Sequence, residues 1–238
     1  MEQHIEVKWK SLVVLLVLSF TGSLVLFVVS TMFLGLLDIY DIFAFNTFLV
    51  IGAPAIGWCS LYNRKQIHPL KFNRLPPKFN FSKPWIVVLC IFILLLGASA
   101  LLASFSQYLL DFLPDVLKNK VLEWEGDQDT LIQSIIDEQG IVSQIKKIVT
   151  MALFPAVFEE MYFRGALLPI TINITGGRRN TSIWIVAIIF SAVHFSITGF
   201  LSRLALGVGF GYLYSYGRGL KLPILAHFIN NMLAIYTM

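Results

Sequence analysis

Charged residues are scarce in this chain. Only 13% of its 238 residues are Asp, Glu, Lys or Arg, whereas 57% are apolar. A soluble domain carries about a quarter charged residues and somewhat less than half apolar ones. The apolar excess lies in long runs without any charge, such as residues 11–37 and 85–104, and about 20 apolar residues suffice to cross a bilayer as a helix. The composition therefore indicates an all-α, polytopic integral membrane helix bundle.

Cysteine is also rare, which excludes a disulfide framework. The two cysteines, Cys59 and Cys90, lie in separate apolar runs and are expected to be small buried hydrophobic residues. No basic stripe with interleaved aromatic residues is present, so we expect no nucleic-acid partner. The first apolar run is too long for the core of a signal peptide and has no clean cleavage site after it, so we interpret it as a retained first transmembrane helix.

Seven apolar segments are expected to span the membrane, and a hidden break in the third would give eight helical elements. They are residues 11–37, 43–62, 84–112, 148–170, 182–197, 200–216 and 222–238. The polar stretch 114–147 carries Leu131, Ile132, Ile135 and Ile136 at a spacing typical of an amphipathic surface helix. We expect one transmembrane domain over residues 1–238.

The links between these spans differ in charge. The segments 63–83, 178–179 and 218–221 are basic, whereas 38–41 and 114–147 are mainly acidic. With seven spans, the basic links fall on one side and the acidic links on the other. Because positive charge marks the cytoplasmic side, we expect a multi-pass protein of the cell (inner or plasma) membrane with a cytoplasmic N-terminus.

The fourth span contains three formal charges, Glu159, Glu160 and Arg164. Each costs about 2.5–3.5 kcal/mol at the centre of a membrane helix, so it persists only if it is paired, wetted or functional. Glu160 and Arg164 are four residues apart and can form an ion pair. Glu159 points about 100° away around the helix. A structural salt-bridge network therefore explains Glu160 and Arg164 well and Glu159 poorly.

Two of the four histidines, His194 and His227, fall within expected spans, and Asn231 lies one turn after His227. A carboxylate in a low dielectric can act as a general base on water, and His and Asn donors can stabilise an oxyanion. Glu159, His194 and His227 could instead hold zinc, although no HExxH arrangement is present. Haem ligation by the two histidines is a further alternative, which leaves Glu159 without a role.

The three polar clusters resemble the signature motifs of the CAAX-protease and bacteriocin-processing (CPBP or Abi) family of intramembrane proteases. The matching residues are Glu159-Glu160-x-x-x-Arg164, Phe190-x-x-x-His194 and His227-x-x-x-Asn231. The resemblance implies that Glu159 activates water, Glu160 and Arg164 support the site, and His194 positions the water. It also implies that His227 and Asn231 form the oxyanion hole. The family has been described both as metalloproteases and as glutamate-dependent proteases, and we favour the second description.

The sequence therefore predicts an intramembrane endopeptidase without a cofactor, with zinc as the alternative, and a protease-like core at residues 148–238 that carries the three motifs. Its expected partners are a peptide or membrane-protein substrate and the lipid bilayer, and the oligomeric state is left open. The rival hypothesis is a non-catalytic immunity or partner-binding membrane protein with a structural polar network. One geometric difficulty accompanies these predictions. Straight helices place His227 only about 9 Å from the 217–223 link, but Glu159 and His194 about 20–25 Å from the same side.

Overall fold

Helices make up the fold, and no strand occurs in the part of the chain that the computed structural model describes, residues 2–33, 36–62, 84–217 and 219–237. The outer helices are α1 (Glu2–Met32), α4 (Pro84–Leu110) and α5 (Asp115–Ile136). One continuous rod joins α2 (Ile39–Asn46), η1 (Thr47–Gly52) and α3 (Ala53–Tyr62). The basic link expected at residues 63–83 lies outside the described residues.

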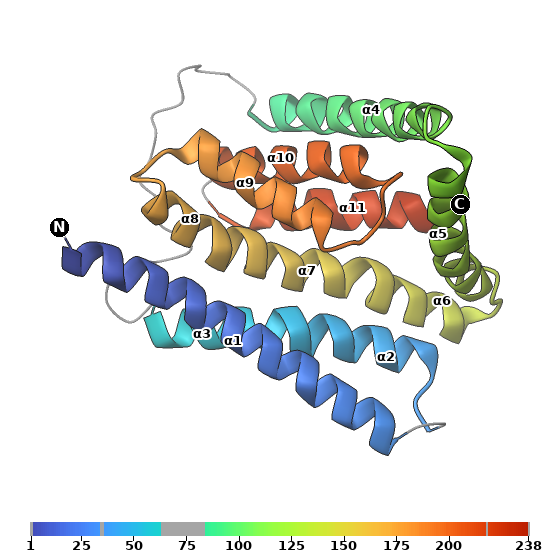
Figure 1. The fold of residues 1–238 in the computed structure, drawn as a ribbon, viewed down its shortest axis with the longest axis horizontal. Helices are drawn as coiled ribbons and strands as arrows, with labels where there is room; N and C mark the ends of the chain where they lie inside the picture. Colours follow the sequence, from blue (N-terminus) through green and yellow to red (C-terminus); the bar gives the residue numbers. More distant parts are fainter. Residues whose placement is uncertain (1, 34–35, 63–83, 218, 238) are drawn as a thin grey trace.

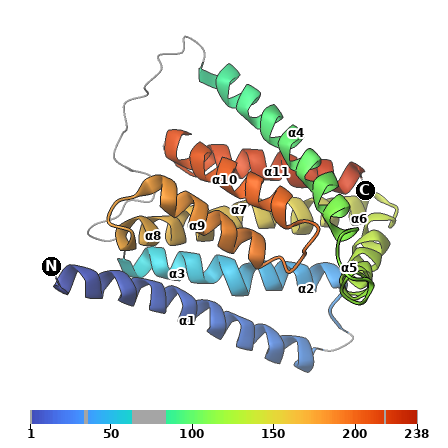
Figure 2. The same ribbon diagram turned by 45° about the horizontal axis from the view of Figure 1, so that its top comes forward.

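A second and longer rod runs through the middle of the molecule. It joins α6 (Ile141–Lys147), η2 (Ile148–Leu153), α7 (Phe154–Glu160), η3 (Met161–Leu167) and α8 (Leu168–Ile174). The chain then forms α9 (Arg179–Ala192), α10 (Phe200–Gly217) and α11 (Lys221–Thr237). The long rod lies between α1 with α2–α3 on one side and α9 to α11 on the other, and α4 packs outside α10 (Figures 1 and 2).

Membrane integration follows from the length and surface of these helices. Four described helical segments are long and apolar enough to cross a bilayer: Trp9–Met32, Ile39–Leu61, Phe92–Leu110 and Ile141–Ile174. The shorter helices α9, α10 and α11 have 14, 18 and 17 residues and complete the bundle. Large apolar side chains such as Phe20 and Phe27 remain exposed on α1, as expected for a surface that contacts lipid. The predicted all-α membrane bundle is confirmed.

The amphipathic helix expected within residues 114–147 is present as α5. It stands across one end of the bundle (Figure 1). Ile135 on its inner face is 1% exposed, whereas Leu131 is 46% exposed. The fourth span begins earlier than expected, at Ile141, because the buried Lys147 donates to the carbonyls of Ile136 and Glu138 and so joins the end of α5 to the long rod.

Each of the three π-helical segments ends two residues before a proline. η1 precedes Pro54, η2 precedes Pro155 and η3 precedes Pro169. Proline has no amide hydrogen and its ring clashes with the carbonyl four residues earlier, so the preceding turn widens. Two widened turns therefore flank α7, the short helix that carries Glu159 and Glu160. Such turns occur often at functional sites.

The level of α11 resolves the geometric difficulty raised by the sequence. Leu220, in the link before α11, packs against the same apolar core as Phe163, and its Cδ1 lies 3.6 Å from the position of a Cβ atom on Gly165. The link therefore dips into the bundle to the level of Gly165. The long rod continues nine residues beyond that point, to Ile174. His227 consequently lies level with Glu160, although it is only six residues from the start of α11.

The glycines of α10 explain how its neighbours approach so closely. A Cβ atom on Gly207 would lie 3.1 Å from that of Ala187 in α9, and one on Gly211 would lie 2.7 Å from Ile183. Gly209 faces Leu95 of α4 instead. These contacts place the backbone of α10 directly against α9, and the carbonyl of Gly207 is thereby brought within reach of the long rod.

Candidate active site

Glu160 and Arg164 form a sealed ion pair on the long rod. Arg164 Nη1 lies 2.7 Å from Glu160 Oε1, and Arg164 Nη2 donates to the carbonyl of Gly207 at 2.9 Å. The two side chains are 0% and 1% exposed. The guanidinium also lies over the ring of Phe190, 4.8 Å from its centroid. This pair is isolated from solvent, and Glu160 Oε1 and both terminal nitrogens of Arg164 are bound by protein groups, whereas Glu160 Oε2 has no hydrogen-bond partner among the described residues.

His227 joins the ion pair from α11. Its Nδ1 lies 2.9 Å from Glu160 Oε1, the same oxygen that accepts from Arg164. Its ring stacks on Phe210 with centroids 5.0 Å apart and an interplanar angle of 23°. Glu160 therefore holds the imidazole in a fixed orientation, with Nε2 directed to the other side of the ring.

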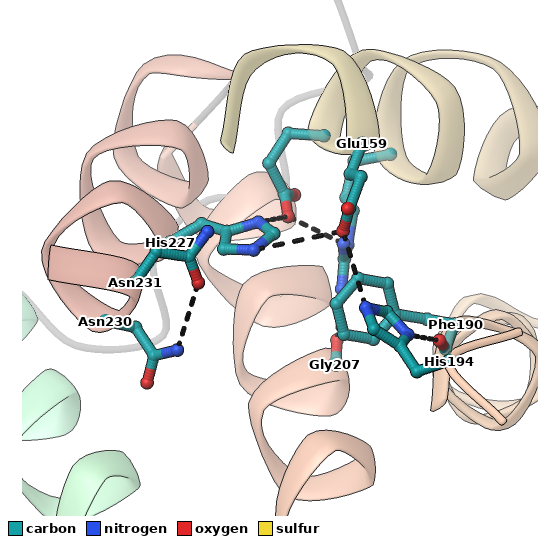
Figure 3. A network of polar contacts seen from close by, with 9 residues as sticks. Glu159, Phe190, His194, Gly207, His227, Asn230 and Asn231 are labelled. Carbon is teal, nitrogen blue, oxygen red and sulfur yellow. Dashed lines mark hydrogen bonds and ion pairs between the residues drawn. The ribbon is translucent and has the colours of Figure 1, made fainter. Parts of the chain in front are cut away.

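Glu159 faces away from the ion pair and toward both imidazoles. Its Oε2 atom lies 3.9 Å from Nε2 of His194 and 3.9 Å from Nε2 of His227 (Figure 3). Oε2 is buried, and none of the described residues donates a hydrogen bond to it. The side chain as a whole is 13% exposed. The carboxylate expected to lack a structural partner is therefore the one that faces both histidines.

The prediction that His194 lies within a helical span, residues 182–197, is wrong. α9 ends at Ala192, and His194 is in the following loop with its side chain 29% exposed. The physical reason is the backbone of Phe195, whose φ of 50° is the left-handed conformation that ends helices. His194 Nδ1 lies 2.6 Å from the carbonyl of Phe190, one turn earlier.

Asn231 lies beside His227 on the same side of α11 (Figure 3). Its Oδ1 accepts a long hydrogen bond of 3.4 Å from Asn230 Nδ2, and its amide nitrogen lies on the His227 side. The side chain is half-buried. This end of Asn231 is thus a donor beside the imidazole of His227.

The hydrogen bonds at Nδ1 determine which ring nitrogens can accept a proton. A carbonyl oxygen only accepts, so the contact with Phe190 requires a proton on Nδ1 of His194. The carboxylate of Glu160, paired with Arg164, requires the same of His227. When either ring is neutral, its Nε2 therefore presents a lone pair toward Glu159. Two lone pairs and a carboxylate oxygen converge on one point, and such a point favours a bound proton, a hydrogen-bonded water or a cation.

A metal-ion site was the alternative for Glu159, His194 and His227. Histidines that bind zinc commonly donate Nδ1 to a carbonyl or a carboxylate, as both of these do. However, within the described part of the chain, no group of three or more His, Cys, Asp or Glu side chains has a geometry that could hold a metal ion. The tautomers thus fit zinc, but the spacing of the donor atoms does not.

Three residues that hold the site in place, Gly207, Trp124 and Glu125, were not predicted from the sequence, and neither was the part played by the carbonyl of Phe190. The carbonyls of Gly207 and Phe190 act through the backbone, which no side-chain motif signals. Trp124 and Glu125 of α5 bind the loop that carries His194, about 70 positions further along the chain. The only signal for them was the polar character of the 114–147 stretch, which does not say what it contacts.

Comparison with known families agrees with the geometry. Residues 141–233 match the family model described as Type II CAAX prenyl endopeptidase Rce1-like. The matched range contains Glu159, His194 and Asn231, together with the rest of the three motifs. Searches of curated proteins and of solved structures returned no match. The match confirms the resemblance noted in the sequence: residues 141–233 match an Rce1-like CAAX prenyl endopeptidase domain, which is consistent with a membrane protease of the CAAX-protease and bacteriocin-processing family.

Proposed function

We propose that this protein is an intramembrane endopeptidase in which Glu159 activates the attacking water. The observation that carries the proposal is the position of Glu159 Oε2, buried, without a hydrogen-bond donor among the described residues, and 3.9 Å from Nε2 of both His194 and His227. Buried polar atoms are nearly always satisfied, and each exception calls for an explanation such as a catalytic role or an ordered water. A separation of 3.9 Å is too long for a direct hydrogen bond and is one that a single water can bridge.

The reaction requires one proton to move from water and back to the leaving group. Glu159 removes a proton from the water, and the resulting hydroxide oxygen forms a bond to the scissile carbonyl carbon. The carbonyl oxygen becomes an oxyanion. Collapse of this intermediate breaks the C–N bond, and Glu159 returns the proton to the departing amine. His194, fixed by its Nδ1 contact with Phe190, orients the water through Nε2.

The oxyanion needs donors that are already in place. The amide of Asn231 is one. His227 donates from Nε2 only when the ring carries a proton on both nitrogens, because Nδ1 already donates to Glu160. Glu160 stabilises that cation directly. With His227 protonated, the charges of Glu159, Glu160, Arg164 and His227 also cancel, which suits a largely buried cluster.

We favour a metal-independent reaction, supported by the donor spacing described above, with zinc as the alternative. Zinc held by Glu159, His194 and His227 would polarise the water and the carbonyl in place of the general base. The two alternatives differ in their response to a chelator. Hydrolysis that survives a strong chelator and depends on Glu159 supports the first, and hydrolysis that is abolished by the chelator and restored by zinc supports the second.

The experiment is a cleavage assay with the purified protein in detergent or lipid nanodiscs. The matched family model names a CAAX prenyl endopeptidase, so we propose a farnesylated CAAX peptide as the first probe and its unprenylated form as the second. Glu159→Gln should abolish cleavage and leave the melting curve unchanged. Glu123→Gln, the same chemical change at an exposed position of α5, should cleave like the wild type. Full activity of Glu159→Gln would refute the mechanism.

Haem ligation fits this arrangement poorly. An oxygen equally close to two axial imidazole nitrogens would lie within the porphyrin ring between them, and Glu159 Oε2 is such an oxygen. The non-catalytic alternative is still tested by the same assay. It explains the Glu160–Arg164–His227 network, but it gives Glu159 no partner.

We also propose that the N-terminus lies in the cytoplasm of a cell bounded by this membrane. Arg178, Arg179 and Lys221 lie near the same end of the bundle as the N-terminus, and α5 with its acidic residues lies at the opposite end (Figure 1). The positive-inside tendency then orients the bundle. Labelling of single cysteines at positions 178 and 123 with an impermeant reagent in intact cells tests it: only position 123 should react.

A further inference from the structure

The loop that carries His194, residues 193–199 (hereafter the His194 loop), depends on contacts from outside its own helices. It connects α9 to α10, and few of its backbone hydrogen bonds are internal. Phe195 donates to Ala192, and Gly199 donates to the hydroxyl of Ser196. Phe195 has a φ of 50°, a conformation that non-glycine residues rarely adopt and that persists only where the surroundings enforce it.

α5 supplies the missing contacts through two adjacent side chains. Glu125 Oε1 accepts from the amides of Ile197 at 2.5 Å and of Thr198 at 3.1 Å, and its Oε2 accepts from the hydroxyl of Thr198. Trp124 Nε1 donates to the carbonyl of Phe195 at 3.2 Å. Hydrogen bonds to an ionised carboxylate are the stronger kind. One carboxylate therefore satisfies two backbone amides and a hydroxyl of the His194 loop.

Arg203 of α10 packs against the His194 loop at Gly199. A Cβ atom on Gly199 would lie 2.0 Å from Arg203 Nη1, so the loop backbone rests on the guanidinium. Arg203 also interacts electrostatically with Glu125 and with Glu159. Arg203 therefore packs against the loop at Gly199, whereas Glu125 binds the loop by hydrogen bonds at Ile197 and Thr198.

From these contacts we propose that Glu125 is a positioning residue for hydrolysis, which holds the His194 loop and thereby sets the imidazole of His194 against Glu159. The inference rests on the proposed function, because positioning has a purpose only if His194 orients the water. Glu125 itself touches neither Glu159 nor the reacting atoms. It acts through the loop, because the imidazole itself is bound only through Phe190 among the described residues, by the contact of Nδ1 with the carbonyl and by the edge-to-face contact of the two rings.

The first test is the kinetics of Glu125→Gln, with Glu123→Gln as the control two residues earlier on the same helix. Glutamine keeps the shape but loses the charge and one acceptor oxygen. We expect kcat to fall by about 10–100-fold, as for other residues that orient a catalytic ligand, with KM and the melting temperature unchanged. Trp124→Phe, which removes one hydrogen bond, should give a smaller decrease. A Glu125→Gln variant with wild-type kcat would overturn the proposal.

The second test asks whether Glu125 acts through His194. In a His194→Gln background, the further change Glu125→Gln should cause no additional loss, because the group it positions is gone. Additive losses would overturn the proposal. Hydrogen exchange of residues 193–199, measured by mass spectrometry, should rise in Glu125→Gln while α10 is unchanged. Unchanged exchange would also overturn it.

The exchange measurement separates failure of this inference from failure of the proposed function. If the wild type cleaves neither peptide probe, the proposed function fails, whereas faster exchange in the loop still shows that Glu125 holds it. If the wild type cleaves and the exchange rises without any change in kcat, the proposed function stands and the positioning role is wrong.

Discussion

Glu159 and Glu160 are adjacent in the chain and have opposite surroundings. Glu160 is fully buried, and its Oε1 accepts from both Arg164 and His227. Glu159 is 13% exposed and faces two imidazole nitrogens at distances that leave space for a small molecule. A helix turn of about 100° separates the two environments. From this difference we infer that Glu160 supports the structure of the site and that Glu159 is available to activate water.

The largest expected effect on stability comes from removing the cation that pairs with Glu160. Arg164→Met should destabilise the protein by about 3–5 kcal/mol, because it leaves an uncompensated carboxylate in a sealed site. Denaturant unfolding in detergent measures this, with Arg178→Met on the exposed α8–α9 link as the control. Adding Glu160→Gln to Arg164→Met should recover part of the loss. Wild-type stability of Arg164→Met would contradict the structural role.

A substitution at Asn231 tests the catalytic part of the comparison. Asn231→Ala should lower kcat by about 10²–10³-fold if its amide binds the oxyanion, the usual effect of losing one such donor. Asn230→Ala is the matched control, because its neighbouring amide contacts Asn231 and neither imidazole. Stability should change little in either variant. Equal kcat values for the two variants would exclude Asn231 from the oxyanion hole.

Substitutions of the two histidines should differ in their effect on stability, although both should lower activity. His227→Gln should cost about 1–3 kcal/mol of unfolding free energy, because Glu160 loses a buried donor. His194→Gln should cost less, since that side chain is 29% exposed and bonds only to the carbonyl of Phe190. Both should lower cleavage. Unfolding midpoints that fall equally would show that the site is not divided in this way.

The smallest effect is expected at an exposed ion pair far from the site. Lys146 bonds to Asp38 and, with the amide of Asp41, lowers the pKa of Asp38 below its usual 3.8. A carboxyl group whose folded pKa is lowered adds stability above its unfolded pKa and loses it as the pH falls through the folded value.

Asp38→Asn keeps the helix cap and removes the charge, so the two proteins should differ slightly at neutral pH and converge in acid. The pair is exposed on both sides, and salt should screen the difference. Unfolding midpoints measured from neutral to acidic pH test this. If the unfolding midpoints still differ at the lowest pH, the difference does not come from the charge of Asp38. The Lys146–Asp38 pair could then not serve as the exposed counterpart of the Glu160–Arg164 pair.

Hydropathy predicts much of the fold, and most errors of that prediction occur at helix ends. The predicted sixth and seventh spans, 200–216 and 222–238, agree with α10 and α11 to within one residue. The fifth span extended five residues too far, because hydropathy does not register the left-handed backbone of Phe195 that ends α9. Apolar composition predicts that a helix exists more reliably than where it stops.

Contacts of the site that lie within one helix could be predicted from the sequence. Glu160 and Arg164 are four residues apart, so their pairing follows from helix geometry. The contact between His227 and Glu160 spans 67 positions, and the contact between Glu125 and Ile197 spans 72. Such contacts depend on where the 217–223 link dips and where α5 crosses the bundle. Only tertiary packing sets these positions.

The most direct test of the account compares Glu159→Gln with Glu160→Gln in one preparation, measuring cleavage per folded molecule alongside thermal unfolding. The account predicts that Glu159→Gln unfolds like the wild type and does not cleave, whereas Glu160→Gln unfolds at a lower temperature and its folded fraction still cleaves measurably. The opposite pattern, with cleavage retained by Glu159→Gln and lost by Glu160→Gln, would contradict it.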